Sequence, residues 1–164
     1  MSDKAGAGTT QVDVVVIGAG AAGLMCAATA AYQGHRVLVL DHANKAGKKI
    51  LMSGGGRCNF TNLNTTPEHF VSANPHFCKS ALKRYTPWHF LELVERHGIE
   101  HVEKAPGQLF CADSAKDILG MLLTECEWAG AEIRLKTGIR RVSQTESGFS
   151  LSTSAGTVPV SYTH

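Results

Sequence analysis

The stretch DVVVIGAGAAGL, residues 13–24, joins an apolar run to three glycines in the spacing G-x-G-x-x-G. The near-continuous apolar residues from Val12 to Ile17 predict a strand that is buried on both faces of a parallel sheet. The alanine-rich residues 21–33, which lie between two glycines, predict a closely packed helix, and residues 36–40 predict a second short strand. This order forms a βαβ unit, so the predicted fold class is α/β with a Rossmann-like parallel sheet.

Each of the three positions needs glycine for a different physical reason. Gly18 permits the tight turn out of the strand, Gly20 lets the backbone approach a pyrophosphate, and Gly23 lets the helix pack closely on the sheet. The helix N-terminus then offers N–H groups and its dipole to phosphates. Asp41 follows at the end of the second strand, where a carboxylate accepts hydrogen bonds from a ribose diol and repels a 2′-phosphate. The motif therefore favours FAD or NAD over NADP at this site, without separating the first two.

The rest of the chain predicts loop, helices and a small sheet. Residues 43–75 are rich in Gly, Asn, Lys and Thr and are predicted to be mainly loop. Three helices are expected next: His76–Tyr85, Pro87–His97 with Thr86 as N-cap, and one from the capping motif at Ser114 to Gly130. Alternating apolar residues after that glycine predict a strand that leads into a small antiparallel β-meander. Residues 1–11 are predicted to be a disordered leader, and residues 12–164 to form one domain.

Composition excludes several classes of protein. A net charge of +2 with intermixed signs gives no indication of a nucleic-acid or membrane partner. The apolar runs are too short to span a bilayer, and the N-terminus lacks the apolar stretch of a secretory signal. Five widely spaced cysteines without a C-x-x-C pair predict neither a disulfide framework nor a zinc site and suit the cytoplasm. The histidines lack metal-ligand spacing, so no metal is expected.

A second glycine-rich stretch, SGGGRCN at residues 53–59, also indicates a ligand contact. Arg57 is either a solvated loop arginine or a cationic contact for a bound pyrophosphate. Cys58 lacks a partner cysteine or a flanking histidine, which favours a structural role over redox catalysis. Asn59 could bond either the backbone of the loop or a cofactor. By contrast, the cations Lys79, Lys83 and Arg84 are interpreted as a solvated helix face.

Residues 12–62 resemble the YhiN/BaiN-like family of bacterial flavoproteins, which have the glutathione-reductase type of FAD-binding fold. The residues that carry the resemblance are DVVVIGAGAAGLMCAATAAYQGHRVLVLD and then GKKILMSGGGRCNFTN, and GQLFCADSAKDIL resembles a later stretch of the family. The first motif is shared by many flavoproteins, whereas the second is far more restricted. The resemblance covers most of the chain, from Val12 to about Val142.

The resemblance implies an FAD-dependent oxidoreductase whose flavin is reduced by NAD(P)H and acts on a small organic substrate. It places the ADP half of FAD on the first glycine motif, the SGGGRCN loop toward the flavin, and the backbone of a later strand against the adenine. The residues it implies as cofactor-binding are Gly18, Ala19, Gly20, Ala21, Ala22, Gly23, Asp41, Lys48, Lys49, Ser53, Gly54, Gly55, Gly56, Arg57, Cys58, Asn59 and Ile139. No catalytic residue is identified.

The sequence departs from the family at Cys111 and Ala112, where the family tends to have a proline, and in three further respects. The family usually carries Arg-Lys in place of Lys48-Lys49 and Glu in place of Asp41. The chain is also shorter and lacks a second glycine motif, so it is expected to be an N-terminal portion that is incomplete relative to the family. Two alternatives stay open: a truncated, non-catalytic fragment, and an NAD-only binding module in which SGGGRCN has no role. A flavoprotein that acts on tRNA is more remote because the charge is near neutral.

Overall fold

The computed structural model describes residues 11–161, which divide into two compact units. The first unit comprises residues 11–47 and 122–161, and the second comprises residues 48–121. The predicted leader lies outside the described residues except for Gln11, and the single domain predicted over residues 12–164 stays a prediction.

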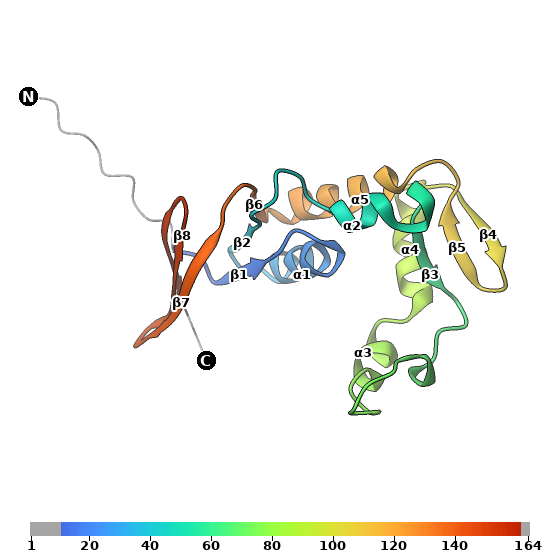
Figure 1. Ribbon diagram of the computed structural model, residues 1–164, viewed down its shortest axis with the longest axis horizontal. Helices are drawn as coiled ribbons and strands as arrows, with labels where there is room; N and C mark the ends of the chain where they lie inside the picture. The colour runs from blue at the N-terminus through green and yellow to red at the C-terminus, as the bar shows by residue number, and fades with distance from the viewer. Residues whose placement is uncertain (1–10, 162–164) are drawn as a thin grey trace, which may run out of the picture. The chain divides into compact units, whose positions relative to one another are not determined.

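A three-stranded parallel sheet forms the centre of the first unit. Its order is β1-β2-β6, with β1 at Val14–Ile17, β2 at Val37–Leu40 and β6 at Glu132–Arg134. Helix α1 (Ala21–Tyr32) joins β1 to β2 and lies beside both strands (Figure 1). The buried side of α1 is mostly alanine, and these short side chains let the helix pack closely on the sheet. The predicted α/β fold class and its βαβ unit are confirmed.

Strands β1 and β2 differ in burial. All four residues of β2, the central strand, are buried. In β1 three residues are only half-buried and Ile17 is exposed, although the sequence predicted burial on both faces. The reason is position: β1 pairs with β2 alone and lies at the edge of the described sheet.

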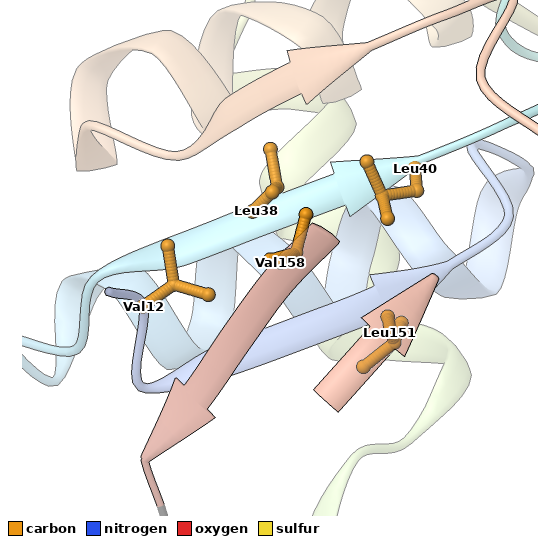
Figure 2. Close-up of a cluster of buried hydrophobic side chains, with 5 residues drawn as sticks. All are labelled: Val12, Leu38, Leu40, Leu151 and Val158. Atoms are coloured by element: carbon orange, nitrogen blue, oxygen red, sulfur yellow. The ribbon is translucent and has the colours of Figure 1, made fainter. Parts of the chain in front are cut away.

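An antiparallel meander follows β6, as predicted. It consists of β7 (Ile139–Thr145), β8 (Gly148–Thr153) and β9 (Gly156–Ser161). Figure 2 shows that side chains of the meander, of β2 and of the residue Val12 before β1 form one hydrophobic cluster. Its members are Val12, Leu38, Leu40, Leu151 and Val158. These five side chains are each at most 7% exposed, so they form part of the core of the first unit.

The second unit contains short helices and a three-stranded antiparallel sheet in the order β3-β5-β4. Its helical elements are α2 (Lys48–Met52), η1 (Ser53–Gly56), η2 (Pro67–His69), α3 (Lys79–Arg84) and α4 (Pro87–Arg96). Its strands are β3 (Asn59–Asn62), β4 (His101–Ala105) and β5 (Gln108–Cys111). The prediction of mainly loop over residues 43–75 was wrong where α2 and β3 occur, and the hairpin of β4 and β5 was not predicted.

The predicted helices after residue 75 are confirmed with different lengths. α3 is shorter than the predicted span, whereas α4 begins after the predicted N-cap Thr86, whose hydroxyl accepts a hydrogen bond from the His89 N–H. The third helix is α5 (Ala115–Ala129), at whose start the Ser114 hydroxyl accepts from Lys116 and Asp117 accepts from the Ser114 N–H. Among the described residues, no helix is both long and apolar enough to cross a membrane.

Candidate dinucleotide site

The turn between β1 and α1 is built from its glycines. Gly18 has a φ of +107°, and its N–H donates to the carbonyl of Leu40 at 2.8 Å. A side chain at Gly23 would collide with the carbonyl oxygen of Gly18, which explains why the helix can lie so close to the turn only with glycine there. A Cβ at Gly18 or at Gly20, in contrast, would meet no atom within 4 Å, so these faces are open.

The N-terminus of α1 leaves its first N–H groups without a capping side chain. Gly20 is the N-cap and supplies no side chain, and the first turn holds no acidic residue. Ala21 and Ala22 are exposed, and the first helical hydrogen bond runs from the Leu24 N–H to the Gly20 carbonyl at 2.9 Å. Exposed N–H groups of this kind, with the helix dipole behind them, favour a phosphate.

Asp41 lies against the glycine turn from the neighbouring strand. Its Oδ2 accepts a hydrogen bond from the Ala19 N–H at 2.8 Å, and its Oδ1 accepts one from the Ala43 N–H at 2.7 Å. His42 Nδ1 also lies 3.6 Å from Oδ1. A carboxylate oxygen can accept more than one hydrogen bond. The structure thus brings together the glycine turn, the α1 N-terminus and the carboxylate, which the sequence predicted as one site.

A segment that the sequence reasoning missed runs beside Asp41. The Thr137 N–H donates to the Asp41 carbonyl at 2.8 Å, and the Lys136 N–H donates to the Ala43 carbonyl at 2.9 Å. These bonds join backbone groups far apart in the chain, so no local sequence signal could have revealed them. The Ile139 side chain packs against the hydrophobic cluster of the first unit, and the predicted contact of its backbone with adenine stays a prediction.

The second glycine-rich stretch forms a tight turn within the second unit. Its three glycines all have left-handed φ values, at Gly54, Gly55 and Gly56. The Cys58 N–H donates back to the Ser53 carbonyl at 3.1 Å, and the Ser53 hydroxyl donates to the Ile50 carbonyl at 2.7 Å. Lys48 and Lys49 are exposed at the start of α2.

Gly54 has a packing role that the sequence did not suggest. A Cβ there would lie 2.7 Å from the Asn59 nitrogen and 2.9 Å from a Phe110 ring carbon, whereas a Cβ at Gly55 would meet nothing within 4 Å. Glycine is therefore required at residue 54, because the loop lies too close to Asn59 of β3 and Phe110 of β5 to leave room for a side chain. Gly55 faces open space, where a ligand could approach.

Two of the residues after these glycines, Arg57 and Asn59, are exposed. Arg57 is exposed, and its carbonyl accepts a hydrogen bond from the Cys111 N–H at 2.9 Å. Asn59 donates its amide to the Thr61 and Leu109 carbonyls at 3.0 and 3.1 Å in the orientation that pairs donors with acceptors. The side chain of Asn59 is thus satisfied by backbone groups of the sheet.

Cys58 is buried and has a φ of +49°, which is unusual for a residue with a side chain. It lies near Cys111, which is also buried. Burial raises the pKa of the Cys111 thiol to about 11, and the nearby Cys58 and Asp117 add to the effect. All five cysteines are free thiols. Within residues 11–161 no three His, Cys, Asp or Glu side chains converge to hold a metal ion.

Residues 12–163 match the HI0933-like protein Rossmann domain. The chain belongs to this family. The family predicted from the two glycine motifs is therefore confirmed, and so is the fold that the resemblance implied.

Two relatives and one solved structure illustrate the range of similar proteins. The chain is 53% identical over 146 residues to the ribosomal RNA dihydrouridine synthase of Escherichia coli K12, covering 89% of the chain and 36% of that protein. It is 30% identical over 128 residues to the 3-dehydro-bile acid delta(4,6)-reductase of Clostridium scindens, covering 76% of the chain and 31% of that protein. The chain therefore spans about a third of the length of these HI0933-like relatives.

Glycine oxidase from Geobacillus kaustophilus has a similar fold. Its crystal structure gives a TM-score of 0.64 at 21% identity, over 93% of this chain and 54% of that one. At such low identity the likeness concerns the fold alone.

Proposed function

We propose that this HI0933-like chain binds FAD and serves as the cofactor-binding portion of an oxidoreductase. The observation that carries the proposal is the hydrogen bond from the Ala19 N–H to Asp41, which holds a carboxylate beside the uncapped N-terminus of α1. The residues fit the ADP half of FAD because the faces of Gly18 and Gly20 are open and a carboxylate such as that of Asp41 is the group that accepts hydrogen bonds from a ribose diol. Family membership favours FAD over NAD.

The residues of the first unit would bind and orient the cofactor. The N–H groups at the start of α1 would donate to the pyrophosphate, and Asp41 would accept from the ribose hydroxyls. In the second unit, Arg57, Lys48 and Lys49 are exposed cations, and their contact with the cofactor stays a prediction from the family resemblance. Bound FAD would supply hydride transfer to the substrate.

We further propose that the substrate is a uridine in ribosomal RNA. The support is the name of the relative that is 53% identical. Dihydrouridine differs from uridine by saturation of one carbon–carbon bond, so uridine, NAD(P)H and a proton would give dihydrouridine and NAD(P)⁺. The net charge of +2 predicted no nucleic-acid partner, and the family resemblance implied a small organic substrate. Net charge does not describe local surfaces, so we rank it below the relative's name.

A small organic substrate is the second candidate. The relative that is 30% identical is named a bile acid reductase, and this supports reduction of a small unsaturated molecule. The lower identity places this candidate second. Either reaction would take place in the cytoplasm, which suits a protein whose five cysteines are free thiols.

Flavin content tests the first part of the proposal. The intact protein should carry the visible absorption of flavin and release FAD on denaturation. NADH or NADPH added without air should bleach this absorption. Protein that binds NAD but cannot be reconstituted with FAD would leave the NAD-only module, and protein that binds neither would leave the non-catalytic fragment.

A comparison of two substrates tests the second part. The intact protein with FAD and NAD(P)H should form dihydrouridine in ribosomal RNA from cells that lack its gene, as measured by nucleoside mass spectrometry. The same reaction mixture with an unsaturated 3-dehydro-bile acid should leave the acid unchanged. Reduction of the bile acid without any dihydrouridine would favour the second candidate.

A further inference from the structure

We infer that the exposed segment from Phe70 to His89, in the second unit, is a surface that binds single-stranded RNA. The inference rests on the proposed function, in which an RNA supplies the reacting uridine. It deepens that proposal by assigning part of the RNA contact to a segment outside the cofactor-binding residues. Figure 1 shows the segment around α3. We call it the α3 surface.

Large apolar side chains are exposed along the α3 surface. Phe77 is 79% exposed and Trp88 is 56% exposed, and Phe70 and Tyr85 are also exposed. Helix α3 itself has no buried residue, so packing within the described residues does not account for it. Several large apolar side chains exposed within one short segment are typical of a surface that binds a partner.

The charges of the α3 surface are all positive. Lys79, Lys83 and Arg84 are exposed on α3, and residues 69–91 contain no aspartate or glutamate. The nearest acid along the chain before it is Glu68, whose pKa lies below its usual value because of hydrogen bonds from Thr66 and its own backbone and the charge of Lys79. The positive charge of Lys79 is thus partly neutralised by Glu68. Lys83 and Arg84 remain as the main cations for a polyanion.

Cations that lie between aromatic residues along the sequence match the chemistry of single-stranded RNA. Lys and Arg neutralise phosphates, and unpaired bases stack on exposed aromatic rings. The Tyr85 ring lies 5.6 Å from the His89 ring, centre to centre, and this contact limits its motion. A ring that is already held loses little conformational entropy when a base stacks on it. The other occupants of such a surface would be an anionic membrane or a further segment of the protein.

The test uses the intact protein and a fluorescein-labelled oligouridylate, followed by fluorescence anisotropy. Lys79→Glu/Lys83→Glu/Arg84→Glu should reduce the salt dependence of log Kd by about 0.7 for each phosphate that the variant no longer neutralises. In a separate variant, Phe77→Ala/Trp88→Ala should weaken binding by about 5-fold or more for each stacked base, while the salt dependence stays the same.

Matched controls come from exposed residues outside the α3 surface. Lys116→Glu/Arg140→Glu/Arg141→Glu makes the same change in net charge, and Phe149→Ala removes another exposed ring. Both controls should bind the oligouridylate like wild type. All variants should melt at the wild-type temperature, because the altered side chains are exposed.

The outcomes distinguish a failure of the proposed α3 surface from a failure of the proposed function. If the intact protein forms dihydrouridine but the α3 variants bind RNA like wild type, the surface is overturned and the function stands. If no dihydrouridine forms but the α3 variants lose RNA binding that the controls keep, the surface stands and the proposed substrate fails. Variants that keep RNA affinity but lose binding to phosphatidylserine vesicles, or that lower the melting temperature, would assign the surface to a membrane or to another segment.

Discussion

The carboxylate of Asp41 accepts a hydrogen bond of 2.8 Å from the N–H of Ala19, and this bond joins the end of β2 to the turn after β1. The Ala19 N–H is therefore already used within the protein. A phosphate at this turn is left with the N–H groups that follow, at the start of α1. The same carboxylate thus shapes the turn and faces the position expected for a ribose.

Asp41→Asn tests this double role. An amide that accepts from Ala19 would direct its NH2 group toward the Ala43 N–H, so one donor would lose its partner. The expected loss of unfolding free energy is about 1–3 kcal/mol, accompanied by weaker FAD binding. Thermal melting and FAD titration measure the two effects. Asp113→Asn, at an exposed aspartate, is the control, and wild-type behaviour of both variants would refute the role of Asp41.

Gly20→Ala and Gly23→Ala should separate ligand approach from packing. An alanine at Gly23 would collide with the Gly18 carbonyl and should cost about 2 kcal/mol of stability. An alanine at Gly20 meets no protein atom and the backbone there has an ordinary φ of −90°, so stability should be kept. FAD affinity should still fall about tenfold, or ~1.4 kcal/mol, because the methyl group faces the pyrophosphate position. Equal FAD affinity of Gly20→Ala and wild type would argue against that position.

Gly54→Ala and Gly55→Ala form a second matched pair. Both glycines have left-handed φ values, so each substitution should cost about 1–2 kcal/mol from backbone strain. Gly54→Ala should cost more, because its Cβ would also press on Asn59 and on the Phe110 ring. Urea unfolding of the two variants measures the difference. Equal losses would mean that the close approach at Gly54 has no energetic importance.

Alkaline pH should destabilise the protein through Cys111. The pKa of its thiol in the folded state is about 11, above the ordinary value of 9.0, so the unfolded state releases its proton first. This contribution to stability is complete below about pH 9 and decreases as the pH rises toward 11. The difference between wild type and Cys111→Ser in unfolding free energy should follow this trend, since serine does not titrate there. A constant difference would contradict it.

Iodoacetamide gives an independent measurement at the same thiol. Near pH 8 the exposed Cys26 should be alkylated while Cys111 stays unmodified, because only the thiolate reacts. Peptide mass spectrometry would distinguish the two sites.

Local patterns predicted the first unit well. The apolar run, the three glycines and Asp41 lie within one continuous stretch. Their spacing was therefore enough to predict the βαβ unit and the position of the carboxylate near the turn. The meander was also predicted, because its strands pair with their sequence neighbours. Short-range order is what a sequence pattern records most directly.

The second unit was predicted less well for a physical reason. β3 is short and polar, and it becomes a strand only by pairing with β5, nearly fifty residues later. Gly54 was taken as a residue for ligand approach, whereas its neighbours Asn59 and Phe110 give it a packing role. The backbone contact of Thr137 with Asp41 was missed for the same reason, since it joins distant parts of the chain.

The pairing of Val12 with β9 has a consequence for the order of events on the ribosome. Val12 donates to the Pro159 carbonyl and accepts from the Ser161 N–H, and its side chain packs with Leu151 and Val158. The first unit therefore cannot complete its core until residues near 160 have been synthesised. The second unit is continuous in the chain, and all of its residues emerge earlier. We expect the second unit to fold first during translation, because Val12 can pair with β9 only after residues near 160 have emerged.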